Sequence, residues 1–184
     1  GASSLFYNPA GMARLEGMNV VVGQTQWIAD ISYNAVGFAY ASNAGVIGFS
    51  MMNVDYGDIQ GTIRSTDDAG YVDTDMFKPS ASVLGLGYAF APTDRFSVGL
   101  HIKFANEDLG TAHLTSESSD AGKTSEDLKM NTTAFDFGLM YQMDWKNLMV
   151  AMSARNFSES LKYAEEQFEL PLTFRMGVSA DVAE

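Results

Sequence analysis

The stretch RFSVGLHIKFA, residues 95–105, alternates between large apolar residues and small or polar residues along its length. A period of two is typical of a β-strand, in which successive side chains point to opposite faces of the sheet. One face would carry Phe96, Val98, Leu100, Ile102 and Phe104. The other would carry Ser97, Gly99, His101, Lys103 and Ala105. The same alternation recurs in SVLGLGYAF (82–90), TAFDFGLMYQM (133–143) and LPLTFRMGVSAD (170–181), so we expect an all-β chain.

This rhythm predicts eight antiparallel strands, and most of them are ten residues or longer. Soluble strands usually have about 5–6 residues, whereas a tilted strand needs about 9–11 to cross a bilayer. The expected strands lie at 18–27, 31–42, 45–56, 79–91, 95–106, 131–143, 147–157 and 170–182.

The connections between these strands differ in length. Short turns are expected at 42–45, 91–94 and 144–147, and long connections at 57–78, 107–130 and about 158–169. A short connection near Ala29 and Asp30 breaks the alternation. Short turns at one end and long loops at the other are typical of an outer-membrane β-barrel. We therefore expect an antiparallel transmembrane β-barrel in a bacterial outer membrane, with lipid or lipopolysaccharide around it.

A soluble sandwich or lipocalin-like barrel is the alternative, because the same alternation fits an apolar face that points inward. Strand length, the alternation of loop length and the few charges in mid-strand favour the membrane. The formal net charge of −12 excludes nucleic acid as an expected partner, since no basic surface is available for phosphates. The chain has no Cys, which excludes disulfides and Cys-metal sites.

The opening residues, 1–17, differ from the rest because they contain a helix-start signal. Asn8 can cap a helix, Pro9 suits its first position, and Gly17 can end it. We expect about two helical turns that plug the barrel mouth at the short-turn end, followed by a barrel over 18–184. A surface leader without a plugging role is the alternative.

Few residues of the sequence suggest catalytic chemistry. His101 and His113 are the only histidines, and neither has the spacing of a zinc site. No G-x-S-x-G elbow occurs. A Ser/His/Asp grouping that assembles in space is not excluded by spacing, but nothing singles one out. We expect no enzyme, no cofactor and no metal.

Four stretches resemble the PorV/PorQ family of outer-membrane proteins, which is similar to the FadL long-chain fatty acid transporters. They are SSLFYNPAGMARL (3–15), QTQWIADISYNAVGFAY (24–40), SARNFSESLKY (153–163) and LPLTFRMGVSA (170–180). The resemblance implies a FadL-like barrel of fourteen strands in the full-length family. It also implies an N-terminal hatch, whose motif here is Asn8, Pro9, Ala10 and Gly11. The chain departs from the family in having about eight strands, no signal peptide and no terminal aromatic residue, so we expect a piece truncated at both ends.

The family resemblance implies a role in type IX secretion, in which the barrel docks secretion-system subunits or secreted cargo proteins. Candidate docking residues are the loop carboxylates Asp67, Asp68, Asp73, Asp75, Glu117 and Asp120. A polar cluster is expected inside the barrel, formed by His101, Lys103, Asp136, Arg155 and Arg175. The alternative function is a FadL-like channel for hydrophobic small molecules, which predicts an apolar tunnel and a pocket near 8–15.

Overall fold

The computed structural model describes residues 1–65, 69–114, 124–158, 161–163, 166–168 and 170–181. Eight strands form one antiparallel sheet in the order β1-β2-β3-β6-β7-β8-β9-β12. These strands are β1 (Met18–Gln26), β2 (Ser32–Ser42), β3 (Gly45–Asp55), β6 (Ser80–Thr93), β7 (Phe96–Leu114), β8 (Thr124–Gln142), β9 (Met149–Ser158) and β12 (Thr173–Ser179). The expected all-β, antiparallel architecture is confirmed.

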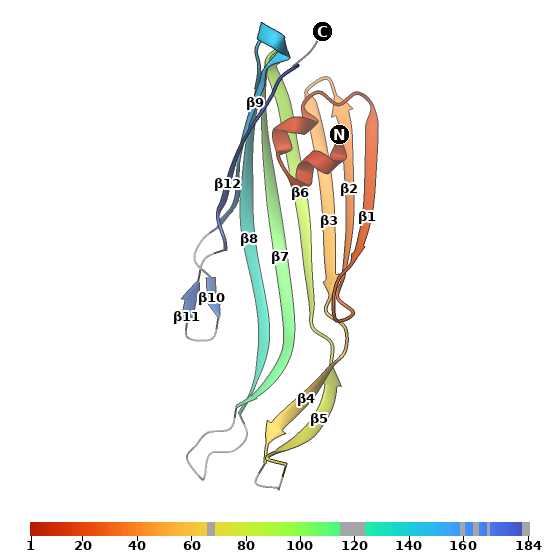
Figure 1. Cartoon of the computed structure of the whole chain (residues 1–184), viewed down its shortest axis with the longest axis vertical. Helices are drawn as coiled ribbons and strands as arrows, with labels where there is room; N and C mark the ends of the chain where they lie inside the picture. Colours follow the sequence, from red (N-terminus) through yellow and green to blue (C-terminus); the bar gives the residue numbers. More distant parts are fainter. Residues whose placement is uncertain (66–68, 115–123, 159–160, 164–165, 169, 182–184) are drawn as a thin grey trace.

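The sheet is open in the part of the chain that the structure describes. β1 pairs with β2 alone and β12 pairs with β9 alone, so the outer edges of β1 and β12 are free. Figure 1 shows both termini near one end of the long strands and the β4–β5 hairpin near the other. None of the described helices is long and apolar enough to cross a membrane.

The long connections are more ordered than the sequence pattern predicts. Strands β7 and β8 continue well past residues 106 and 131, and pair as far as Leu114 opposite Thr124. The connection 57–78 contains the hairpin of β4 (Ile59–Arg64) and β5 (Tyr71–Phe77). The connection 158–169 contains β10 (Leu161–Tyr163) and β11 (Glu166–Phe168). Their apolar residues do not alternate regularly with polar ones, so periodicity gave no strand signal, but their backbone groups still pair.

The N-terminal segment is helical, but the expectation of one two-turn helix ended by Gly17 is wrong. It forms two 3₁₀ helices, η1 (Ala2–Phe6) and η2 (Pro9–Met12). Hydrogen bonds to the carbonyl three residues earlier recur along it, as in Ser4 N to Gly1 O and Gly11 N to Asn8 O. Gly17 lies beyond η2, with a φ of 67°, and turns the chain into β1.

The two faces of the sheet differ sharply. Large apolar side chains on one face are exposed, as in Leu86 at 55% and Phe104 at 53%. The opposite face, which we call the concave face, carries glycine, alanine, serine and the buried polar side chains, and η1 and η2 pack on it. Strand pairing aligns four polar residues in one row across the sheet. The row lies on the same face as the exposed apolar side chains, at the end nearest the β4–β5 hairpin. That row consists of Asn53, Ser82, Asn106 and Asn131.

Candidate functional site

The N-terminal segment packs against glycine residues of the sheet. Leu5 and Met12 are fully buried. A Cβ at Gly48 would lie 2.8 Å from Met12 Sδ and 2.9 Å from Leu5 Cδ2, and a Cβ at Gly87 would collide with Leu5. The glycines of β3 and β6 therefore provide the space that these two side chains fill.

Two further glycines allow direct backbone contact. A Cβ at Gly99 on β7 would collide with the backbone of Pro9 and Ala10, and one at Gly138 on β8 would collide with Asn8 Oδ1. Pro9 and Ala10 are buried, and Gly11 is half-buried. The four residues of the predicted hatch motif thus lie together at the point where the chain approaches β7 and β8 most closely.

Asn8 joins the segment to the sheet. Its Oδ1 accepts a hydrogen bond from Ala10 N at 3.1 Å, which is the cap expected from the sequence. Its Nδ2 donates to the carbonyls of Leu139 at 3.3 Å and Met152 at 3.2 Å. One side chain therefore both caps η2 and links it to β8 and β9.

Arg14 is a second anchor, which the sequence analysis missed. Its guanidinium donates to Gln142 Oε1 at 2.7 Å and to the Asp94 carbonyl at 2.6 Å, and its Nε lies 3.4 Å from Ser97 Oγ. The signal available in the sequence was the single basic side chain of residues 1–17, in which Glu16 is the other charged side chain.

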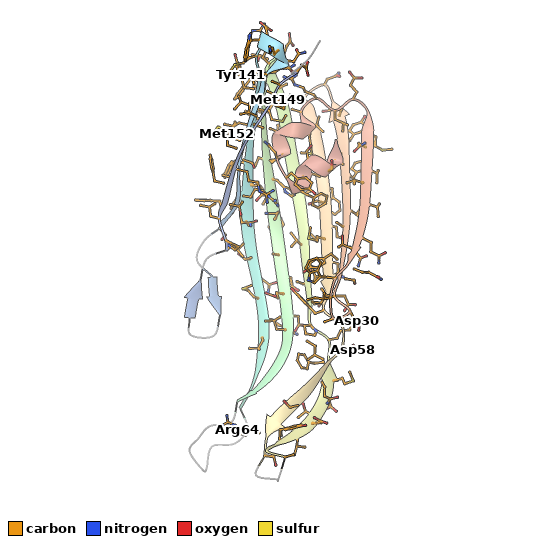
Figure 2. All side chains as sticks on the ribbon, in the orientation of Figure 1. Asp30, Asp58, Arg64, Tyr141, Met149 and Met152 are labelled. Atoms are coloured by element: carbon orange, nitrogen blue, oxygen red, sulfur yellow. The ribbon has the colours of Figure 1, made fainter. Side chains whose placement is uncertain are left out.

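A small cavity lies beside these anchors. It has a volume of about 40 Å³ and is lined by Ala10, Gly11, Arg14, Ser97, Met140, Tyr141, Gln142 and Met149. Figure 2 shows Tyr141 and Met149 at this end of the sheet. Pockets for small organic molecules measure about 300–1,000 Å³, so this cavity suits water and not a fatty acid.

The predicted polar cluster is centred on Asp136, which is fully buried on β8. Its Oδ1 lies 2.7 Å from Lys103 Nζ and accepts a hydrogen bond from the backbone N–H of Asn156 at 2.8 Å. Its Oδ2 lies 3.5 Å from both His101 Nδ1 and Arg155 Nε. Four of the five predicted cluster residues therefore meet at one carboxylate.

Backbone irregularity in β9 makes this arrangement possible. The β8–β9 register shifts between Phe135 and Phe137, and Asn156 adopts a φ of 61°. Asp136 pairs with His101 on β7 but has no ladder partner on β9. Its carboxylate instead accepts the hydrogen bond of the Asn156 N–H. Sequence periodicity alone gave no signal for the role of Asn156.

Arg175 lies apart from this cluster. It is an exposed residue of the edge strand β12, opposite Ser153. It forms no hydrogen bond or ion pair with any other residue that the structure describes.

Two of the predicted loop carboxylates are described, and they lie at the other end of the sheet. Asp73 and Asp75 are exposed on β5. Asp67, Asp68, Glu117 and Asp120 lie outside the described residues.

A cleft of about 590 Å³ separates the β4–β5 hairpin from the extended part of β7 and β8. Its lining residues are Ile59, Gln60, Gly61, Thr62, Thr74, Asp75, Met76, Phe77, Leu109, Gly110 and Leu128. Figure 2 shows Arg64 near the tip of the hairpin and Asp58 at its neck. The cleft lies at the end of the sheet farthest from η1 and η2, and its lining combines apolar side chains with polar ones, including the Asp75 carboxylate.

Metal chemistry has no candidate site here: no group of three or more His, Cys, Asp or Glu side chains converges among the described residues. The sequence matches no model of a known protein family and no curated protein.

Proposed function

We propose that the chain forms the wall of a bacterial outer-membrane β-barrel, with its exposed apolar face in lipid. The apolar residues of β7 run from Phe96 to Phe104, which is roughly 26 Å along a strand at about 3.3 Å per residue. A tilt of about 40° converts this to roughly 20 Å of depth, near the apolar band of about 25 Å in outer-membrane barrels. The polar row at Asn106 would lie at the outer surface of that band.

The free edges of β1 and β12 support closure by further strand pairing. In hydrocarbon no water satisfies an exposed backbone N–H or carbonyl, and each such group costs several kcal/mol. The two edges therefore have to pair with further strands before the sheet can lie stably in a bilayer.

We propose that the barrel is of the PorV/PorQ type and docks secretion-system subunits or secreted cargo proteins at its hairpin end. The cleft between β4–β5 and β7–β8 is the observation that carries this proposal. It lies beyond the polar row, so it would be open to proteins outside the membrane. Exposed Asp73 and Asp75 give it an acidic rim.

The alternative is a FadL-like channel for hydrophobic small molecules. Its support is the N-terminal segment, which packs on the concave face as a removable hatch would. The 40 Å³ cavity beside that segment is too small for such a ligand, so docking is the function we favour.

Photo-crosslinking tests this proposal in the full-length protein in its own outer membrane. A photoreactive amino acid replaces Thr62 in the cleft, and a matched variant carries it at Asn43 in a short turn. We expect secretion components or secreted proteins to crosslink at Thr62 and not at Asn43. Equal protein crosslinking at both positions, or a co-purified apolar molecule with no protein partner, would contradict the docking role.

A further inference from the structure

The buried polar cluster contains a serine that the docking function does not use. Ser50 on β3 lies with its Oγ 2.9 Å from His101 Nε2. On the other side of the ring, His101 Nδ1 lies 3.5 Å from Asp136 Oδ2. All three residues are buried, with exposures of 3%, 2% and 0%. Serine, histidine and aspartate in this order are the parts of an activated nucleophile.

The charges around the ring determine which nitrogen carries the proton. A carboxylate accepts hydrogen bonds and donates none, so Nδ1 is the protonated nitrogen that faces Asp136. Nε2 then accepts the hydroxyl proton of Ser50. Neither His101 Nδ1 nor Asp136 Oδ2 has a hydrogen-bond partner among the described residues. The 3.5 Å gap exceeds a hydrogen bond, and such contacts are often loose before substrate binds.

Neighbouring residues hold this arrangement in place. Lys103 and the Asn156 N–H both bind Asp136 Oδ1, and Oδ2 faces His101 Nδ1 and Arg155 Nε, each at 3.5 Å. Gly85 lies beneath the Ser50–His101 contact, and a Cβ there would collide with both Ser50 Oγ and His101 Nε2. Only glycine at position 85 leaves room for the two side chains to meet.

We propose that Ser50 is a nucleophile that accepts an acyl group from a carboxylic ester, with His101 as its general base and Asp136 as the positioning residue. Ser50 Oγ attacks the ester carbonyl carbon while its proton passes to His101 Nε2. The bond to the alcohol oxygen breaks, and that oxygen takes the proton. Water then attacks the carbonyl carbon of the Ser50 ester and gives a proton to His101 Nε2. The bond between Ser50 Oγ and the acyl carbon breaks, His101 returns the proton to Oγ, and the carboxylic acid leaves.

The surroundings define the substrate class and the rate. The side chains of Leu5 and Met12 cover Gly48 and Gly87 in the adjacent row of the concave face, so an acyl group beside Ser50 would contact apolar side chains. An ester with an apolar acyl group is therefore the substrate class we propose. The backbone groups flanking Ser50 pair within the β3–β6 ladder, so they offer no ready oxyanion hole. Loss of one oxyanion donor slows an enzyme by about 10²–10³-fold. We therefore expect slow acylation, by activated esters and phosphonate reagents first.

The test is covalent labelling of the full-length protein in detergent with an alkyl fluorophosphonate, followed by mass spectrometry of its peptides. We expect one phosphonate per chain, on Ser50. Ser50→Ala should abolish labelling. Ser97→Ala is the matched control: Ser97 is also buried on the concave face but contacts Arg14 and not a histidine. This variant should label as the wild type does.

His101→Gln separates a catalytic role from a structural one. It keeps a polar side chain but removes the base, so we expect labelling to fall at least about tenfold while the circular dichroism stays unchanged. Absence of label from the folded wild-type protein would overturn the proposal. Label on serines other than Ser50, or equal labelling of wild type and His101→Gln, would do the same.

Discussion

Gly99→Ala should release the N-terminal segment from the sheet. A Cβ at Gly99 would lie well under 3.0 Å from backbone atoms of Pro9 and Ala10. Unlike the end of a flexible side chain, these backbone atoms cannot rotate away from the added Cβ. The segment must therefore lift from β7, and its buried side chains must leave the concave face with it.

The magnitude follows from what the segment buries. Leu5 and Met12 are both fully buried, and each contributes about 1.5–3 kcal/mol relative to an exposed position. Loss of both weakens docking by about 3–6 kcal/mol. Because 1.4 kcal/mol is a tenfold change in an equilibrium constant, the open population should rise by roughly 10²–10⁴-fold.

Trypsin cleavage after Arg14, measured by mass spectrometry on the detergent-solubilised protein, reports this opening. Arg14 is held by Gln142 and the Asp94 carbonyl, so the docked segment should resist cleavage. The matched control is Gly177→Ala, where a Cβ meets no atom within 4 Å. We expect fast cleavage in Gly99→Ala and wild-type cleavage in Gly177→Ala. Equal rates in the two variants would refute the close packing described above.

Three further changes test the hatch, the buried cluster and the hairpin end. Asn8→Ala removes two hydrogen bonds to the sheet and should weaken docking by about 1–2 kcal/mol; unchanged trypsin cleavage would argue against this anchor. Asp136→Ala leaves Lys103 buried without its carboxylate, so the free energy of unfolding in detergent should fall by about 3–5 kcal/mol; a loss below about 1 kcal/mol would contradict a buried ion pair. The Gly110 N–H, with Lys129, holds the pKa of Asp108 below its usual range. The ionised Asp108 carboxylate therefore stabilises the Asp108–Gly110 turn above the ordinary Asp pKa of about 4. This stabilisation is lost as pH falls through the lower pKa of Asp108 in the folded protein. The hydrogen-exchange protection factor of the Gly110 amide should drop in that pH window. Constant protection would contradict the hydrogen bond from the Gly110 N–H to the Asp108 carboxylate.

The strands of the main sheet could be predicted because their signal is local. In β7, alternation at residues 96–105 placed Phe104 on one face and His101 on the other. The structure agrees, with Phe104 53% exposed and His101 2% exposed. Asn8 and Pro9 likewise carried a local capping signal, and Asn8 caps η2.

The features that were missed depend on register between distant strands. Ser50 and His101 are 51 residues apart and meet only because β6 aligns β3 with β7 over Gly85. The contacts of Arg14 depend on where the segment lies across β7 and β8. The sequence of the β7 extension, EDLGTAHL at 107–114, does not alternate between apolar and polar residues, so hydrophobic periodicity carries no signal for it.

The most direct test of the central claim measures what surrounds the apolar face. The chain has no Cys, so single cysteines at Leu86, Ile102 and Asn106 can carry a nitroxide spin label in the full-length protein in lipid vesicles. We expect labels at Leu86 and Ile102 to be more accessible to oxygen than to a water-soluble nickel complex, because they face hydrocarbon. The label at Asn106 should show the reverse preference. Greater nickel accessibility at Leu86 and Ile102 would show that this face meets water and would contradict the membrane barrel.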